Sequence, residues 1–366
     1  MRAGLIIYGS LDTVSGGYLY DCQLVEYLRG CGDTVEIFSL PWRNYPRHLL
    51  DNFSNALYRR VRATELDVLL EDELNHPSVL RLNRQLRGQV RYPIVSIVHH
   101  LRGCETHASI LRAGYRWIER HYLASVDGFI CNSETTRRTI AAALQRAELA
   151  RSVVVPPAGD RFASTITPEI IEQRAHEAGP LRLVFVGNVI PRKRLLVLLE
   201  ALLQLPTGLC QLTVVGNTDL DELHMRVVNH LFMVTSLSGV TLTGAISDAE
   251  LAAILAHSQV LVVPSDYEGF GIVYLEGMGF GLPAIGTTSG AAKEIITDGL
   301  NGYLIPPNDP VVLAKCLATL VSDRDKLAHL SLAAHERFLA QPSWNDSLAR
   351  IRQVLLQWIS DPTSQG

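Results

Sequence analysis

Two glutamates separated by seven residues are the side chains of this sequence best suited to chemistry. Glu268 and Glu276 flank a glycine-containing loop that follows the apolar run at 260–263. The run predicts a buried parallel strand, and the residues after it predict a tight loop and a helix that begins near Gly271. Ligands of open α/β sheets bind beyond the carboxyl ends of strands. The two carboxylates are therefore placed to accept hydrogen bonds from the hydroxyl groups of a sugar and a ribose.

A second chemical motif follows the apolar strand predicted at 181–186. Gly187 and Asn188 begin this loop, and Arg192 and Lys193 end it at the start of a helix. Cations at a helix N-terminus oppose the helix dipole, so a bound anion explains them better than a solvated basic cluster does. The motif thus predicts contact with an anionic ligand such as a phosphate.

Alternating strand and helix patterns position both motifs. The first strand at 4–9, a helix that ends near residue 29 and a strand at 34–40 form a βαβ unit, and the alternation restarts at 181 after a polar stretch. The expected class is α/β. Its expected parts are a first Rossmann-like domain at 1–165, a linker at 166–180, a second Rossmann-like domain at 181–342, and an amphipathic helix at 343–366.

The residues around the two glutamates carry a family resemblance. From Pro264 to Pro283 the chain reads Pro-Ser-x-x-Glu-Gly-Phe-Gly-x-x-x-Leu-Glu-Gly-Met-x-x-Gly-x-Pro. This segment resembles the signature of retaining glycosyltransferases of the GT-B fold, in particular family 4 (glycosyl transferases group 1). The resemblance implies an N-terminal acceptor domain and a C-terminal nucleotide-sugar donor domain that face each other across a cleft. It also implies that the C-terminal helix crosses back to the N-terminal domain.

The resemblance assigns roles in the donor domain. Glu276 would accept from the ribose hydroxyls, and Glu268 would hold the sugar hydroxyls. Lys193 and Arg192 would stabilise the departing diphosphate. Asn188 stands where the family usually has an arginine. Either Arg192 supplies the missing guanidinium, or the site has one cation fewer. The other implied donor-binding residues are Gly187, Gly244, Ala245, Gly269, Phe270, Gly271 and Ile272.

Two motifs of the first domain also match the family. Gly16 and Gly17 resemble the glycine loop that faces the donor, although two glycines also serve as a simple turn. His99 and His100 follow the strand predicted at 94–98, where family members have a histidine near the transferred sugar. Which of the two enters the site is left open, and a structural role is the alternative. We expect no metal, since no further His, Cys or Asp has ligand spacing nearby.

The composition excludes several functions. A net charge of −4 argues against a nucleic-acid partner, and no run of 18 apolar residues predicts a transmembrane helix. Six scattered cysteines without Cys-x-x-Cys spacing indicate free thiols in a reducing cytoplasm. The sequence starts directly on a predicted strand, so we expect no signal peptide. Seven arginines of the first domain allow two interpretations: Arg59, Arg60, Arg62, Arg81, Arg84, Arg87 and Arg91. They form a solvated helix face with ion pairs to the acidic residues of 65–73, or they contact lipids at the inner face of the membrane.

The expected function is a retaining, metal-independent glycosyltransferase without a cofactor. Its donor is expected to be a UDP-sugar ahead of a GDP-sugar, and its acceptor a glycan, a lipid-linked glycan or a small molecule recognised by 41–93. The Asp219-Leu220-Asp221 pattern is interpreted as a solvated loop rather than a metal motif. Three alternatives stay open: a nucleotide-sugar epimerase, a phosphorylase on the same scaffold, and a non-catalytic sugar-nucleotide-binding subunit of a polysaccharide assembly complex.

Overall fold

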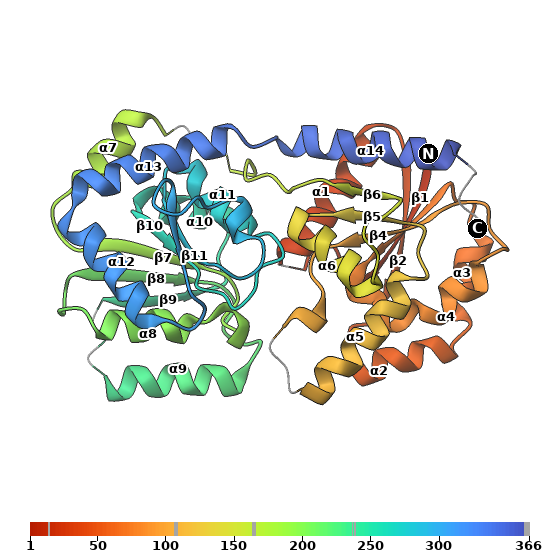
Figure 1. Cartoon of the computed structure of the whole chain (residues 1–366), viewed down its shortest axis with the longest axis horizontal. Helices are drawn as coiled ribbons and strands as arrows, with labels where there is room; N and C mark the ends of the chain where they lie inside the picture. Colours follow the sequence, from red (N-terminus) through yellow and green to blue (C-terminus); the bar gives the residue numbers. More distant parts are fainter. Residues whose placement is uncertain (14, 106–108, 163–165, 236, 238, 362–366) are drawn as a thin grey trace. The chain divides into compact units, whose positions relative to one another are not determined.

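The computed structural model describes residues 1–13, 15–105, 109–162, 166–235, 237 and 239–361 (Figure 1). The chain forms two compact units, Met1–Pro157 with Trp344–Gly366, and Ala158–Ser343. Each unit contains one six-stranded parallel sheet flanked by helices. The predicted α/β class is therefore confirmed.

The sheet of the first unit has the order β2-β1-β3-β4-β5-β6. Its strands are β1 (Arg2–Tyr8), β2 (Thr34–Leu40), β3 (Val68–Asp72), β4 (Ile94–Val98), β5 (Gly128–Cys131) and β6 (Ser152–Val154). Its helices are α1 (Gly16–Gly30), α2 (Tyr45–Leu50), α3 (Ala56–Ala63), α4 (His76–Leu86), α5 (Ser109–Leu123), α6 (Glu134–Leu144) and α14 (Trp344–Ser360). Short 3₁₀ turns are η1 (Asp51–Phe53), η2 (Glu73–Asn75) and η3 (Arg102–Cys104).

The sheet of the second unit has the order β12-β11-β10-β7-β8-β9. Its strands are β7 (Leu181–Val186), β8 (Cys210–Val215), β9 (Val240–Gly244), β10 (Val260–Val262), β11 (Ala284–Thr287) and β12 (Gly302–Ile305). Its helices are α7 (Pro168–His176), α8 (Leu195–Leu203), α9 (Glu222–Val234), α10 (Asp248–His257), α11 (Ile272–Gly279), α12 (Pro310–Ser322) and α13 (Arg324–Leu339). Its 3₁₀ turns are η4 (Pro191–Lys193) and η5 (Ala292–Glu294).

Strand order decides where each unit can bind a ligand. The order reverses between β1 and β3 in the first unit and between β7 and β10 in the second. Loops that leave such a switch point diverge to opposite faces and open a crevice at the carboxyl ends of the strands. β10 is fully buried and most of β7 is buried in the core of their unit, so the loops after them start from fixed points.

The C-terminal helix α14 belongs to the first unit, as the fold predicts. Arg352 on this helix pairs with the buried carboxylate of Asp33, at 2.7 Å between Nε and Oδ2. Near the start of the helix, the Ser347 hydroxyl donates to the carbonyl oxygen of Pro156 over 2.9 Å. These contacts join the end of the chain to segments that precede the second unit.

The predicted division of the chain differs from the structure in two places. The boundary lies at 157/158 rather than at 165, and the stretch expected to be a linker contains α7. That helix buries Ile171 and Arg174, and the Arg174 guanidinium donates to the carbonyl oxygens of Phe280 and Gly281 over 2.5 and 3.2 Å. The polar composition of this stretch concealed a packed element because one of its charged side chains bonds buried backbone.

The arginines of α3, α4 and the segments after them are exposed, as expected, but their predicted acidic partners are not available. Glu71 and Asp72 lie on the central strand β3 and are fully buried, and Glu73 is nearly so. Glu65 and Asp67 pair with Arg2 instead. The ion-pair prediction was therefore wrong for these acids, because β3 runs between β1 and β4 and carries its polar end inside.

All six cysteines are free thiols. Among the helices that the structure describes, none is long and apolar enough to cross a membrane.

Candidate active site

The two loops that carry the sequence motifs of the second unit leave neighbouring strands. β7 and β10 pair in parallel, with Val260 opposite Leu183. The loop after β7 contains η4, and the loop after β10 continues to Gly271 before α11 begins. A backbone hydrogen bond from the amide of Asp266 to the carbonyl oxygen of Arg192, 2.9 Å long, joins them. The predicted phosphate loop and the predicted sugar loop are thus one site.

Glu268 is the centre of this site. Lys193 Nζ lies 2.6 Å from Glu268 Oε1, and the hydroxyl of Ser265 donates to the same oxygen over 2.6 Å. Arg192 Nη1 lies 3.7 Å from Oε2 of the same carboxylate and donates to the Tyr267 carbonyl oxygen over 2.9 Å. Both candidate cations therefore meet one carboxylate, although 75 residues separate Lys193 from Glu268.

The positive charges around Glu268 affect the pKa of its carboxyl more than burial does. Burial alone would raise the pKa of this carboxyl, but the charges of Lys193 and Arg192 and the hydrogen bonds from Lys193 and Ser265 lower the pKa to about 2. Burial also lowers the pKa of Lys193, and the Glu268 carboxylate opposes that change. Glu268 is therefore ionised at neutral pH and holds the two cations at one point.

We expect the Glu268→Gln variant to lose less stability in acid than the wild type. The pKa of Glu268 falls from 4.5 to about 2 on folding, so its contribution is full above pH 4.5 and is lost as the pH falls toward 2. The shift corresponds to about 3 kcal/mol. Urea unfolding of both proteins at several pH values between about 6 and 3 measures the difference. Parallel losses in the two proteins would contradict the assignment.

Gly271 requires a glycine for two reasons. Its φ is 96°, and it forms the N-cap of α11. A Cβ at this position would lie 2.5 Å from Cδ2 of Tyr274, whose hydroxyl is fixed by donation to the Val263 carbonyl oxygen over 2.8 Å. The tyrosine ring therefore cannot move aside without the loss of a buried hydrogen bond.

Gly271→Ala is expected to lower the free energy of unfolding by about 2–5 kcal/mol, because a left-handed φ and a steric overlap act together. Gly299→Ala is the matched control, since Gly299 has φ 75° and no atom near its Cβ position. The control should lose only about 1–2 kcal/mol. Equal losses in urea unfolding would show that Tyr274 is not the obstacle.

Glu276 lies on α11 and is buried. Its Oε1 pairs with Nε of Arg161 at 2.9 Å, and Nη1 of Arg161 lies 3.4 Å from Oδ1 of Asp248. Burial raises the pKa of Glu276, while Arg161 opposes the shift. The sequence did not single out Arg161, which is the residue that holds this carboxylate in its present orientation.

The other predicted donor-binding residues lie at carboxyl ends of strands in the same sheet. Gly187 directly follows β7, and a Cβ there would lie 3.4 Å from Cε of Lys193. Asn188 is half-buried and accepts through its carbonyl oxygen from the amide of Ile190. Gly244 ends β9, two strands away from β7, and the adjacent Ala245 is exposed.

The second unit also contains Arg194 and the Asp-x-Asp pattern. Arg194, which the sequence reasoning missed, pairs with Asp266 at 2.6 Å between Nη2 and Oδ2. In the Asp-x-Asp pattern, Asp221 caps α9 by accepting from the amide of His224 over 2.9 Å, while Asp219 is exposed. The pattern therefore includes a helix start, where the sequence had indicated only a solvated loop.

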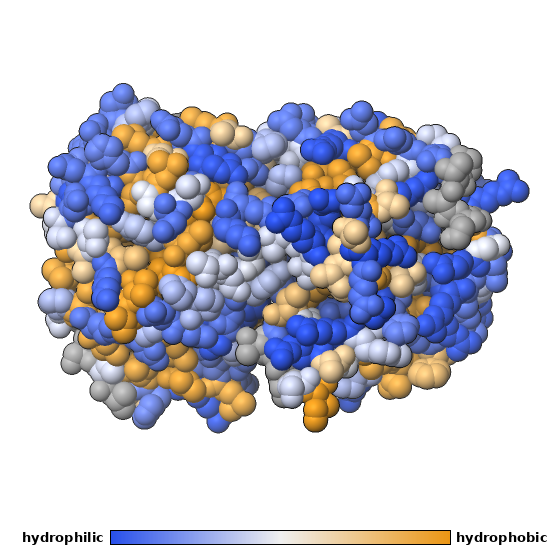
Figure 2. Space-filling model, in the orientation of Figure 1, coloured by the Kyte–Doolittle hydropathy of each residue, from blue (hydrophilic) through white to orange (hydrophobic). Residues whose placement is uncertain are grey.

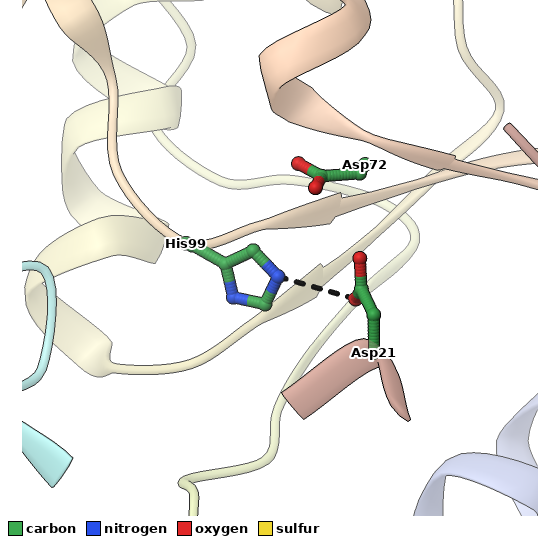
Figure 3. Close-up of side chains that lie close together, drawn as sticks. All are labelled: Asp21, Asp72 and His99. Carbon is green, nitrogen blue, oxygen red and sulfur yellow. Dashed lines mark hydrogen bonds and ion pairs between the residues drawn. The ribbon is translucent and has the colours of Figure 1, made fainter. Parts of the chain in front are cut away.

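In the first unit, His99 and Gly17 come together at the switch point. A Cβ on Gly17 would lie 3.1 Å from the His99 ring, so the glycine allows the helix start to approach the histidine. His99 Nε2 lies 3.2 Å from Oδ1 of Asp21, as Figure 3 shows. Its backbone amide donates to Glu73 over 2.7 Å. His100 lies apart from this group and pairs with Glu105 at 2.9 Å.

The acids around His99 form a buried cluster, defined here as Asp21, Asp72, Glu73 and His99. Asp21 comes from α1, Asp72 from the end of β3, and Glu73 from η2. Burial raises the pKa of Asp72 and, for Glu73, raises it to about 7. Burial would lower the pKa of His99, but the bond and charge of Asp21 and the nearby acids raise it to about 9. Sequence reasoning missed the three acids, although two of them stand at the end of an apolar strand.

Two family models match the chain. The model described as Glycosyltransferase Family 4 matches residues 20–160, and the model described as Glycosyl transferases group 1 matches residues 180–323. The chain is a glycosyltransferase of family 4. Its first matched segment contains the cluster around His99, and its second contains the site around Glu268.

Curated relatives agree with this assignment. The glycosyltransferase is 26% identical over 387 residues to the phosphatidyl-myo-inositol mannosyltransferase of Mycobacterium leprae, with 97% of this chain and 96% of the relative covered. It is 28% identical over 253 residues to the D-inositol 3-phosphate glycosyltransferase of Xylanimonas cellulosilytica, with 65% of this chain and 59% of the relative covered. A nucleotide-sugar glycosyltransferase is therefore supported, and the non-catalytic and epimerase alternatives are not favoured.

Solved structures show the same fold. The sucrose-phosphate synthase of Thermosynechococcus elongatus superposes with a TM-score of 0.81 at 21% identity, with 97% of this chain and 98% of that chain covered. Anabaena HepE in complex with UDP-glucose gives a TM-score of 0.78 at 18% identity, with 98% and 100% covered. The glycosyltransferase thus has the GT-B fold predicted from its sequence.

Proposed function

We propose that this glycosyltransferase transfers a sugar from a UDP-sugar with retention of configuration, and that side-chain cations rather than a metal ion receive the diphosphate. The observation that carries the proposal is the convergence of Lys193 and Arg192 on Glu268 at the β7–β10 switch point. UDP is favoured because HepE, which shares the fold, was solved in complex with UDP-glucose.

Each residue of the site has a separate task in this proposal. Lys193 and Arg192 neutralise the negative charge that grows on the leaving diphosphate. Glu268, held by Lys193 and Ser265, accepts hydrogen bonds from sugar hydroxyls, and Glu276 accepts from the ribose. The leaving phosphate oxygen helps to deprotonate the acceptor on the same face of the sugar. No protein nucleophile is assigned.

The acceptor is proposed to carry an inositol phosphate. Two groups of relatives are named for such acceptors, phosphatidyl-myo-inositol in one and D-inositol 3-phosphate in the other. The exposed apolar side chains of α5 favour the lipid form, since Ile110, Leu111 and Trp117 are 85%, 55% and 61% exposed. Apolar atoms at the beginning of α5 stand out at the lower edge of Figure 2. Exposed Arg112 and Arg116 lie between them and suit an anionic membrane surface.

The test is an acceptor and donor matrix with product analysis. UDP- and GDP-sugars are incubated with phosphatidylinositol in vesicles or with free inositol phosphate, and nucleotide release is followed. NMR of the product then gives the anomeric configuration. Release with the lipid alone, a product of retained configuration and full turnover in EDTA support all parts of the proposal. An inverted product would overturn retention, and dependence on EDTA-removable metal with Lys193 intact would overturn the role of the cations.

A further inference from the structure

The buried cluster of the first unit contains carboxylate oxygens that have no partner. Asp21 and Asp72 are fully buried. Among the side chains that the structure describes, Oδ2 of Asp21 and Oδ2 of Asp72 have no hydrogen-bond partner. Their other oxygens are used, because Asp21 Oδ1 meets His99 and Asp72 Oδ1 accepts from the amide of Leu74 over 2.9 Å.

Two buried carboxylates this close together are costly to ionise unless cations offset both charges, and His99 can offset only one of them. An ionised carboxylate taken out of water loses its hydration, and like charges at short range repel. Within the described residues, the ion pair of Asp21 is made with His99 and not with an arginine or lysine, and Asp72 has none. One oxygen of Asp21, one of Asp72 and a ring nitrogen of His99 all lie within 4.8 Å of one another. Figure 3 shows the Asp72 carboxylate turned toward the other two side chains.

We propose that Asp21, Asp72 and His99 bind a divalent first-row metal ion such as Mn²⁺ or Zn²⁺. The donor set decides the class, because an imidazole with two carboxylates suits Mn²⁺ and Zn²⁺ better than Ca²⁺, which takes oxygen ligands. The three ligands come from three elements, α1, the end of β3 and the segment after β4, so the ion fixes the loops of the switch point relative to one another.

Neighbouring residues supply an outer shell for the ion. Glu73 accepts from the backbone amide of His99 over 2.7 Å, and the ring of Tyr20 packs against the imidazole edge-on at 5.2 Å between centroids. Such contacts set the orientation of a ligating histidine. The His99 side chain is 12% exposed, whereas that of Asp21 is fully buried, so water can reach the cluster only from the side of His99.

This site shares no residue with the diphosphate site. Its ligands belong to the first unit, whereas Lys193, Arg192 and Glu268 belong to the second. Metal binding by the first unit can therefore be tested independently of how the leaving group is stabilised. The test measures metal affinity rather than turnover.

The experiment uses the full chain after treatment with EDTA and gel filtration. Mn²⁺ is titrated in, and the free ion is followed by electron paramagnetic resonance, which avoids the thiols that Zn²⁺ would occupy. We expect the wild type to bind one equivalent and Zn²⁺ to displace it. Asp72→Asn and Asp21→Asn should weaken binding by at least about 100-fold, and Glu73→Gln by about 10-fold. Asp219→Asn, on the exposed loop, is the matched control and should bind as the wild type does.

Melting temperatures test the same site in variants that bind no metal. Without metal, Asp72→Asn should have a higher Tm than the wild type, because it removes one of two facing charges. With Mn²⁺, the Tm of the wild type should rise and that of Asp72→Asn should not. The inference is overturned if the wild type binds no Mn²⁺ or Zn²⁺ at 1 mM (about the upper limit for a specific site), or if Asp72→Asn binds equally well. Absence of binding in the wild type would mean that a shared proton offsets the two carboxyls, and equal binding by Asp72→Asn would place the ion at another site.

Discussion

Replacing Lys193 with alanine is expected to lower kcat by about 10²–10³-fold, the scale found when one charge-stabilising donor is removed. Lys193 Nζ is 2.6 Å from Glu268, and only 15% of its side chain is exposed, so water cannot take over its charge. The effect should fall on kcat rather than on the KM for the donor, because charge on the diphosphate increases as the sugar departs. Steady-state kinetics with a saturating acceptor measures both quantities.

Three comparisons show whether the loss is chemical or structural. Lys193→Arg keeps the charge and should recover part of kcat. Lys315→Ala makes the same substitution at an exposed site of α12 and should leave kcat unchanged. Lys193→Ala also leaves the buried Glu268 carboxylate with the Ser265 hydroxyl and with Arg192 at 3.7 Å, so the Tm of the variant is expected to fall. Near-normal kcat in Lys193→Ala at a temperature where it is folded would remove Lys193 from catalysis.

Replacing Glu276 with alanine is expected to abolish stabilisation of the protein by its nucleotide. A ligand at 100 times its Kd stabilises the folded protein by about 2.7 kcal/mol. A thermal-shift screen with UDP, GDP, ADP and their common sugars should show this rise for one nucleotide series in the wild type. The carboxylate of Glu276 is only 6% exposed and is fixed by Arg161, so the ribose hydroxyls would lose an oriented, charged acceptor.

The variant itself should remain folded. Arg161 is 22% exposed and keeps Asp248 as a partner, so removal of Glu276 does not leave an isolated buried cation. Glu200→Ala, at an exposed site of α8, is the matched control and should keep the nucleotide shift. A normal shift in Glu276→Ala would place the ribose elsewhere. No shift in the wild type with any nucleotide would count against the donor site as described.

The sequence by itself determined the fold class and most of the strands. Parallel strands covered on both faces form nearly continuous apolar runs, so segments such as 181–186 and 260–263 can be recognised locally. The motif from Pro264 to Pro283 was equally accessible, because strand, loop and helix start lie in one continuous segment. β12 was not visible, since its four residues lie between turn-forming residues and half of them are only partly buried.

The tertiary structure alone decided which residues meet. Lys193 and Glu268 are 75 residues apart, and Asp21 and His99 are 78 apart. Each pair is joined because its two segments leave strands near a switch point, and strand order is a property of the whole sheet rather than of a sequence window. Counting ligand spacing along the chain therefore found no partners for His99, although α1 and β3 bring two acids to it. The same reason explains why Arg161 beside Glu276 could be found only in the folded chain.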